Sequence, residues 1–379
     1  MSLFRSKQSA GIHSFWWSST MTKSYIPNDI PEGSAERQMK KILYDAPIEH
    51  KILQLVDQLP DVCRLRFGKI LSKIILRSNP LKAVATALLA KDYDVVAPHW
   101  FKYGRLIVLL LGAANRKKII LIEFIDYNTA DKNPLIAFIY DLYIKSILAP
   151  CMRRSVLGIQ VMTQWEKDRL HSVYNMPESS VRCIRWPIAG WEQLTPTNQA
   201  GNGTVFSSGR SACDWDTLFA AARLGRWPLT VVCSKKDLPH VKELNKTVGA
   251  AVYSEISVKE HDRLLAEASV CVICLKEANK SSGQIRLGAC ITLSVPCVVT
   301  AVRGMDGYLI DGVTGCSVPP RDAGAICRAV ERLIADRRFC NDLLDRGRKH
   351  VSSYNKDHYV QKIINLLFQE AGPYESRIV

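Results

Sequence analysis

A short turn of small residues is the part of this chain whose residue types most clearly suggest chemistry. Positions 281–284 read Ser-Ser-Gly-Gln, between an apolar run at 270–275 and a segment with helical spacing. An apolar run bounded by polar residues is typical of a strand buried on both faces. Free N–H groups at a helix start, together with the helix dipole, favour an anion in such a turn. Ser282, Gly283 and Gln284 are therefore predicted to hold a phosphate-bearing ligand.

The residues around this turn resemble the C-terminal half of GT-B glycosyltransferases, the group that includes the large GT4 family. Those enzymes commonly carry a Gly-rich turn, a helix, a G-x-P-V-V strand and then D-G-x-x-G-x-x-V-P-P-x-D. Here the strand at 294–299 reads Ser-Val-Pro-Cys-Val-Val. The last element is filled by Asp311, Gly312, Gly315, Val318, Pro319, Pro320 and Asp322. The resemblance extends over about residues 203–350 and is weak in the N-terminal half.

The resemblance implies an α/β protein of GT-B fold, with two Rossmann-like domains whose parallel sheets face an inter-domain cleft. It further implies a metal-independent glycosyltransferase for hexosyl or glycuronosyl transfer. The donor would be a UDP- or GDP-linked sugar, bound as substrate, with no cofactor. The acceptor would be a glycan or a lipid-linked molecule in polysaccharide or glycoconjugate synthesis. Domain two would hold the donor and domain one the acceptor.

Alternating strand-like and helix-like segments support two such domains. We predict an acceptor domain at 1–188, a linker at 189–203 and a donor domain at 204–354. By analogy with the resembling fold, residues 355–379 form a helix that packs back on the first domain. Within the first domain, helical spacing covers Ala35–Leu59 and Val62–Ala90, and a strong strand is predicted at Ile119–Ile125.

A cation follows the first strand of the second domain. Gly209-Arg210 follows the predicted strand that begins at Val205, and open α/β sheets bind ligands at the carboxyl ends of their strands. In the resembling enzymes an Arg at this place contacts the diphosphate, usually with a Lys five residues later. Trp215 stands at that later position here, so the usual partner cation is missing.

Three other cations are candidates to replace it. Lys235 and Lys236 follow the next strand, and Arg286 lies on the helix after the glycine turn. All three could neutralise a diphosphate leaving group. For the two lysines, a solvated loop pair is an equally good interpretation.

One departure from the family pattern bears on activity. Many GT4 enzymes carry two glutamates eight positions apart, and the later place falls at Ala289. Some other GT-B enzymes have an S-G-Q turn in place of the first glutamate, which implies hydrogen bonds from Gln284 to the donor. The chain therefore resembles a divergent branch. A catalytically degenerate GT-B protein that acts as a binding or scaffold partner is the alternative.

An inverting enzyme needs a general base, usually Asp, Glu or His from domain one. Asp126 follows the strong strand and is the first candidate; His99 follows the shorter strand at 94–98 and is the second. For each residue, a turn or cap role is at least as good an interpretation. Glu123 lies inside the strong strand, where a structural role is predicted.

The net charge of +15 and the pI of about 9.3 would be explained by an anionic partner such as phosphorylated substrates, membranes or nucleic acid. A soluble basic protein without such a partner is the alternative, and it is not rare. Charge is the only feature that supports a nucleic-acid partner, because no zinc-finger or RNA-recognition signature is present. We therefore predict that the protein does not bind nucleic acid. Arg66, Lys69, Lys73 and Arg77 share one face of a predicted helix whose other face is apolar. Such a helix suits an anionic membrane; a core-packed helix with a solvated basic face is the commoner structure.

The twelve cysteines do not form a disulfide pattern, since several lie inside apolar runs. Cys271 and Cys274 match C-x-x-C, but they lie within a predicted strand and have no second pair, so a structural role is predicted. No metal site is visible in the sequence. Free thiols fit a reducing compartment. We predict a cytoplasmic protein, with the inner face of the cytoplasmic membrane as a further possible location.

Overall fold

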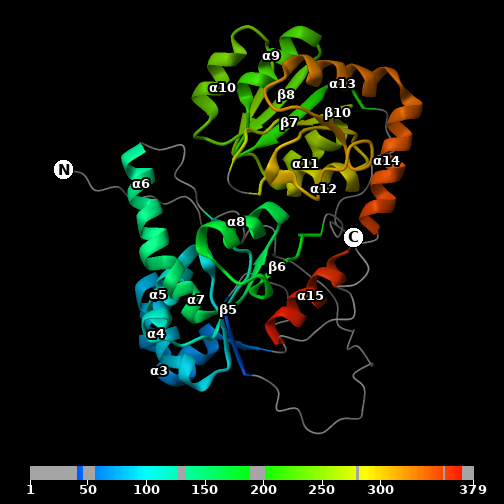
Figure 1. The fold of residues 1–379 in the computed structure, drawn as a ribbon. Coiled ribbons are helices and arrows are strands. Elements are labelled where there is room, and N and C mark those ends of the chain that lie inside the picture. The colour runs from blue at the N-terminus through cyan, green and yellow to red at the C-terminus, as the bar shows by residue number, and fades with distance from the viewer. Residues whose placement is uncertain are drawn as a thin grey trace, which may run out of the picture.

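The computed structural model describes residues 41–45, 56–126, 134–187, 201–278, 281–352 and 355–368. These residues form two six-stranded sheets, ordered β2-β1-β3-β4-β5-β6 and β12-β11-β10-β7-β8-β9. Neighbouring strands pair in parallel in both sheets. Figure 1 shows the second sheet with its helices above the first. The predicted α/β architecture with two parallel sheets is thus confirmed.

The first domain consists of the first sheet and the helices between its strands. Its strands are β1 (Ile42–Tyr44), β2 (Asp57–Gln58), β3 (Val95–Ala97), β4 (Ile119–Leu121), β5 (Val156–Val161) and β6 (Val181–Cys183). Its α-helices are α3 (Leu59–Arg77), α4 (Asn79–Leu89), α5 (Arg105–Ala113), α6 (Pro134–Tyr143), α7 (Ala149–Ser155) and α8 (Gln164–Tyr174). Two π-helical turns, η2 (Trp100–Gly104) and η3 (Ile144–Leu148), precede α5 and α7.

The second domain is the second sheet with its helices. Its strands are β7 (Val205–Gly209), β8 (Leu229–Cys233), β9 (Ala251–Ser254), β10 (Val270–Ile273), β11 (Cys297–Thr300) and β12 (Cys316–Val318). Its helices are α9 (Trp215–Gly225), α10 (Leu238–Asn245), α11 (Val258–Glu267), α12 (Gln284–Thr292), α13 (Ala323–Ala335) and α14 (Arg337–Ser352). A short turn of helix, η5 (Arg303–Met305), follows β11. The domain limits given above stay a prediction.

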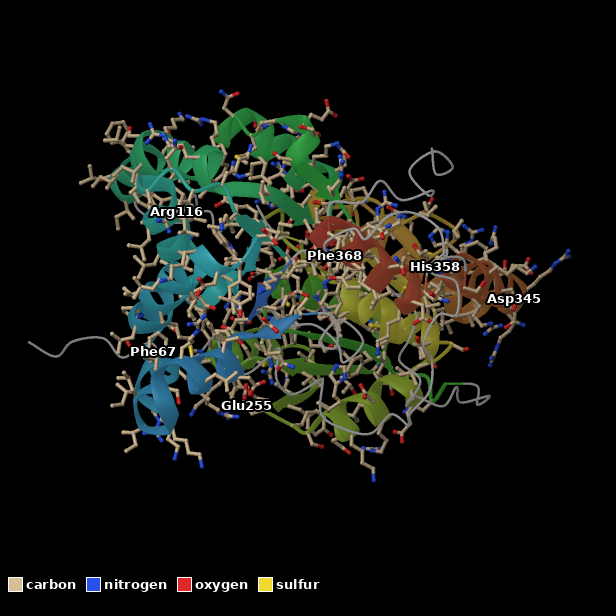
Figure 2. All side chains as sticks on the ribbon, turned by 90° about the horizontal axis from the view of Figure 1, so that it is seen from below. Phe67, Arg116, Glu255, Asp345, His358 and Phe368 are labelled. Atoms are coloured by element: carbon tan, nitrogen blue, oxygen red, sulfur yellow. The ribbon has the colours of Figure 1, made fainter. Side chains whose placement is uncertain are left out.

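The last helix, α15 (Lys356–Phe368), lies on the first sheet. Its buried residues Tyr359, Val360, Ile363 and Leu367 share an apolar cluster with residues of β1, β3 and β4. Gly158 on β5 leaves room for this helix, because a Cβ there would lie 3.0 Å from the Leu366 side chain. The chain therefore returns to its first domain after completing the second. Figure 2 shows this from below, with Phe368 and His358 labelled on α15 and Asp345 on α14.

The predicted helix at Ala35–Leu59 is wrong where the structure describes that range. Ile42–Tyr44 forms β1, which is fully buried and pairs with both β2 and β3. A short apolar run has the same appearance in a buried strand and in a buried helix. Pairing with strands more than fifty residues away, such as Ile42 with Val95, decides between them here. Most of the predicted range lies outside the described residues.

The predicted basic helix is broken in two. Gly68 has φ 71° and ψ 171° inside α3, so the chain turns out of helical geometry at this residue. Arg66 lies before the break and pairs with Asp92 at 3.0 Å, whereas Lys69, Lys73 and Arg77 lie after it. The prediction that all four basic residues share one continuous helical face is therefore wrong. Lys69, Lys73 and Arg77 do share one helical face, on the part of α3 that follows Gly68.

Candidate functional site

The carboxyl edges of the two sheets face each other. Trp165 and Glu166 open α8, directly after β5 of the first sheet, whereas Ser281 and Arg303 follow β10 and β11 of the second. A Glu166 carboxylate oxygen accepts the Ser281 backbone N–H at 3.3 Å. The Arg303 guanidinium lies 5.4 Å from the centre of the Trp165 ring. Residues at the ends of the strands of both domains are thus brought together.

The second sheet has its topological switch point between β7 and β10. The chain proceeds outward from β7 through β8 and β9, and returns on the other side of β7 with β10. Open α/β sheets leave a crevice at such a point, outside the carboxyl ends of the strands. Gly209 ends β7, and α12 begins after β10. The switch point therefore lies between two of the segments that the sequence singled out.

Gly283 is required for the start of α12. Its φ is 97°, and an added Cβ would lie 2.9 Å from both Leu275 Cδ1 and Met305 Sδ. Glycine alone avoids both the strained backbone and the contact. No side chain caps this helix start. The first-turn N–H groups of α12 are thus left for another hydrogen-bond acceptor.

Arg286 places a cation at the same point. It lies in the first turn of α12, and its Nη1 atom would be 2.9 Å from a Cβ added to Gly209. This Nη1 atom is buried and, in the described part of the chain, has no oxygen or nitrogen acceptor; only the Cys213 thiol, a weak acceptor, lies beside it. The helix carries no acidic residue, and Ala289, one turn later, is buried in an apolar cluster. Because the position of Ala289 carries no carboxylate, Arg286 has no acidic residue on its own helix.

The other predicted donor residues lie further from this point. Arg210 reaches across the end of β8 to Glu255, which follows β9, in a long ion pair of 3.9 Å between half-exposed side chains. Lys235 and Lys236 are exposed in the loop after β8. Trp215 is buried, and its indole N–H donates to Asp237 at 3.4 Å. It belongs to the core of the second domain.

Gln284 uses its amide within the protein. Its Nε2 donates to the Gly304 carbonyl oxygen at 2.6 Å, which ties the start of α12 to η5. Ser282 lies half-buried beside Gly283 in the turn. Of the predicted donor set, the structure thus brings Gly209, Ser282, Gly283, Gln284 and Arg286 to one place. The donor roles of all these residues stay predictions.

Asp126 connects two elements of the first domain. Its side chain is buried and accepts from Arg169 Nε on α8 and from the Tyr174 hydroxyl, both at 2.9 Å. Both carboxylate oxygens are thus occupied. The arrangement holds the segment after β4 against α8, and a role as general base stays a prediction.

Replacing Asp126 with asparagine should lower the free energy of unfolding by about 2 kcal/mol, because Arg169 is four-fifths buried and would lose its counter-ion. Urea unfolding measures the change. The control is Asp61→Asn, which removes an exposed partner of Arg64 and should cost less than about 0.5 kcal/mol. Unchanged stability with strongly reduced turnover would instead favour Asp126 as the base.

His99 and Glu123 lie at the same edge of the first sheet. His99 follows β3 and is buried, with its carbonyl accepting the N–H groups of Tyr103 and Gly104. Glu123 follows β4, is 1 % exposed and has φ 53°, in the left-handed region that non-glycine residues rarely adopt. Burial raises the pKa of Glu123 to about 8, and the Trp186 side chain opposes this only in part. The glutamate is therefore held in its neutral form at pH 7.

Glu166 is a buried residue at this edge that was not predicted from the sequence. Its carboxylate accepts from the Thr163 and Met162 N–H groups on the first domain and from Ser281 on the second. Burial raises its pKa, and the hydrogen bonds from Ser281 are the main opposing influence. The signal was present as Thr163-x-x-Glu166 before a helical segment, which is a capping box. Its second role as a link between domains depends on tertiary structure.

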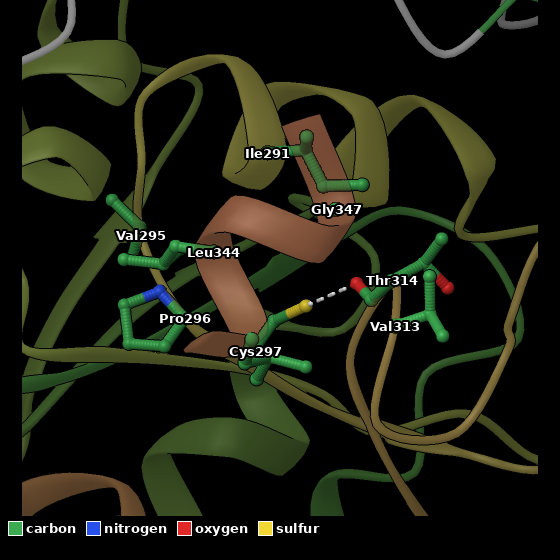
Figure 3. A pocket seen from close by; sticks show the side chains of 9 residues that line it. Ile291, Val295, Pro296, Cys297, Val313, Thr314, Leu344 and Gly347 are labelled. Carbon is green, nitrogen blue, oxygen red and sulfur yellow. Dashed lines mark hydrogen bonds between the residues drawn. The ribbon is translucent and has the colours of Figure 1, made fainter. Parts of the chain in front are cut away.

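Two surface hollows lie away from this edge. One is a narrow apolar crevice between α12, α14 and the 313–314 loop, where Cys297 Sγ donates to the Thr314 carbonyl oxygen at 3.4 Å (Figure 3). Cys297 begins β11, so this crevice is at the amino end of the strand. The other is lined by residues of β2 and the start of α3. Among the described residues, no three His, Cys, Asp or Glu side chains are placed to hold a metal ion.

Residues 215–336 match the family described as Glycosyl transferases group 1. No curated protein matches the chain. Three solved structures that match are a glycosyltransferase from Rickettsia africae, HepE (Alr3699) from Anabaena in complex with UDP, and sucrose-phosphate synthase from Thermosynechococcus elongatus.

The similarity to these structures is in fold, at low sequence identity. The Rickettsia protein is 14 % identical over 77 % of this chain and 81 % of its own, with a TM-score of 0.58. HepE is 14 % identical over 87 % of this chain and 100 % of its own, with a TM-score of 0.64. The synthase is 18 % identical over 76 % of this chain and 77 % of its own, with a TM-score of 0.58. The fold is thus that of the GT-B glycosyltransferases, and the second domain carries the group 1 glycosyltransferase pattern in a divergent form.

Proposed function

We propose that this chain transfers a hexosyl or glycuronosyl group from a nucleotide sugar to a glycan or lipid-linked acceptor in polysaccharide or glycoconjugate synthesis. The donor diphosphate would lie at the switch point of the second sheet. There it would accept hydrogen bonds from the first-turn N–H groups of α12 and from Arg286. The acceptor would bind against the first domain, with Asp126 or His99 as candidates for the base that removes its proton.

The buried Nη1 atom of Arg286, which has no oxygen or nitrogen acceptor among the described residues, is the observation that carries this proposal. A buried cationic nitrogen without an acceptor is costly, and a bound anion would remove that cost. Its position beside Gly209 and above an uncapped helix start fits a diphosphate. Charge on a departing diphosphate can be stabilised by such groups in place of a metal ion. We accordingly propose transfer without a metal and without a cofactor.

We favour UDP over GDP as the nucleotide. HepE was solved with UDP and also with UDP-glucose, and TarM from S. aureus with UDP; all of them have this fold. For the location, we propose the cytoplasm, at the inner face of the membrane when the acceptor is lipid-linked. Lys69, Lys73 and Arg77 would then contact anionic lipid, with Arg66 nearby across the Gly68 break.

Thermal unfolding with nucleotides tests the proposal directly. At a hundred times its Kd a ligand adds about 2.7 kcal/mol to the free energy of unfolding. For a domain of this size that corresponds to a rise in Tm of roughly 5–10 °C. We expect this rise with UDP, a smaller one with GDP, and the same result in EDTA. No response to any nucleotide or nucleotide sugar would contradict the proposal.

Turnover separates the enzyme from its degenerate alternative. A scaffold protein of GT-B fold, which the absence of a glutamate at Ala289 favours, could still bind UDP. A true transferase also hydrolyses its donor slowly when no acceptor is present. Release of UDP from a panel of UDP-sugars should therefore be detectable with the intact chain. Binding without any such release would favour the scaffold function.

A further inference from the structure

Helix α6 is an apolar element that the described residues leave uncovered. None of its ten residues is buried. Leu135, Ile136, Phe138, Ile139 and Leu142 are between 50 % and 66 % exposed. Leu135, Phe138, Ile139 and Leu142 lie on one side of the helix, because they are three or four residues apart. In Figure 1, α6 projects beyond the helices of the first domain. Large contiguous apolar surfaces of this kind mark contact sites for a partner or a membrane.

This helix belongs to the one stretch of the described residues, Pro134–Ser155, that is long and apolar enough to cross a membrane. The fold excludes a crossing. Ile144 and Leu148 of η3 are buried, and α7 packs into the core of the first domain before β5 begins. Only α6 is left outside, and ten helical residues extend about 15 Å, half of a hydrocarbon core. The geometry is that of a helix lying in an interface.

Helices α3 and α4 of the first domain also expose apolar residues. On α4, Leu81, Val84 and Leu88 form an exposed stripe, and on α3, Ile70 and Ile74 are exposed. Helices α3, α4, α5 and α7 pack successively against one another, and α6 continues from η3. Figures 1 and 2 agree that these helices form one outer side of the first domain; Phe67 on α3 and Arg116 after α5 are labelled there.

The charges on this side are positive. Helix α3 carries five basic residues and one acidic residue, and Asp61, the acidic one, pairs with Arg64. Lys69, Lys73 and Arg77 are exposed beside Ile70 and Ile74. On α6 the one charged residue, Asp141, is paired with Lys145 at 2.7 Å. An exposed apolar surface bordered by lysine and arginine complements an anionic bilayer.

We propose that α6 inserts into the interfacial region of an anionic bilayer, while Lys69, Lys73 and Arg77 contact its phosphate groups. Binding would then combine apolar insertion with electrostatic attraction. A second copy of the chain fits the surface less well, because a two-fold contact would place the same basic residues opposite one another. This membrane surface does not depend on the reaction proposed above.

Flotation of the intact protein with lipid vesicles tests the proposal without any substrate. We expect binding to vesicles that contain phosphatidylglycerol and much weaker binding to phosphatidylcholine alone. The double variant Phe138→Asp/Ile139→Asp should reduce partitioning by on the order of tenfold or more, since two large apolar groups no longer insert. The variant Lys69→Glu/Lys73→Glu should lose the preference for anionic vesicles.

The control is Leu224→Asp on α9. Leu224 is 62 % exposed, similar to Phe138 at 66 %, but lies in the second domain. It should bind vesicles like the unchanged chain. Because all these side chains are exposed, each variant should keep its circular dichroism spectrum. Equal binding by the α6 variant and the unchanged chain would overturn the proposal. So would a self-associating chain that becomes monomeric in the α6 variant and binds no vesicles, which would identify a second copy as the occupant.

Discussion

Arg286→Ala is expected to reduce turnover by on the order of a hundredfold and to abolish most of the Tm rise with UDP. The reason is that Arg286 places a buried guanidinium nitrogen beside Gly209, at the start of α12, with no oxygen or nitrogen acceptor in the described residues. Removal of one preorganised group that stabilises developing charge typically costs two to three orders of magnitude in rate. Donor-dependent turnover and nucleotide thermal shifts measure the two effects.

Two further variants make this result interpretable. Arg286→Lys keeps the charge but loses the planar fork that suits phosphate, so its activity should fall between the unchanged chain and the alanine variant. Arg338→Ala removes an exposed arginine of α14 and should leave both measurements unchanged. If Arg286→Ala binds UDP and turns over like the unchanged chain, then the anion site lies elsewhere. The exposed cations Arg210, Lys235 and Lys236 would be the next to test.

Glu123→Gln is expected to stabilise the protein at pH 8 and to change little at pH 5. In the unfolded chain this glutamate ionises near its ordinary pKa of 4.5, whereas the folded protein raises the pKa to about 8 through burial. Between these values the folded state binds more protons, so the free energy of unfolding falls as the pH rises. The stabilising contribution is complete below pH 4.5 and is lost as the pH passes 8.

The size of this effect is large for one side chain. Each pH unit between the ordinary and the raised pKa costs about 1.4 kcal/mol, so the total is on the order of 5 kcal/mol. Glutamine keeps an acceptor for Trp186 but cannot ionise. Urea unfolding at pH 5 and pH 8 measures the difference between variant and unchanged chain. Glu243→Gln, on the exposed side of α10, is the control and should show no such pH dependence.

If Glu123→Gln raised the free energy of unfolding equally at pH 5 and pH 8, the result would contradict the assigned pKa of Glu123. A loss of turnover in Glu123→Gln, with stability raised as expected, would have a different meaning. It would show that the left-handed backbone and the buried carboxyl at this strand end also serve the reaction, since strained residues cluster at functional sites. Turnover is therefore recorded together with stability.

Much of the second domain could be predicted because its signals are local. The buried run at 270–275, the cap at Asp322 and the glycine at 283 each describe their own surroundings. Strand burial on both faces produces a continuous apolar run, and a left-handed residue at a tight turn calls for glycine. These constraints act over a few residues, so they can be recognised without knowing what the rest of the chain does.

The first domain was predicted less well, because its decisive contacts are distant in sequence. Ile42–Tyr44 is a strand only because β2 and β3 lie on either side of it. The apolar residues of α3 and α6 have the spacing of core residues, yet many of them are exposed. Periodicity indicates that a helix has an apolar side but not which surface that side will meet.

The sequence by itself determined the α/β class, the GT-B resemblance and the turn at 281–284, since local backbone preferences and apolar periodicity are written in short segments. Tertiary structure alone decided that Arg286 lies beside Gly209, more than seventy residues earlier in the chain. It also decided that Asp126 is paired with Arg169, and that α6 has no cover within the described residues. Such contacts depend on the order in which strands join a sheet, and no local property of the chain encodes that order.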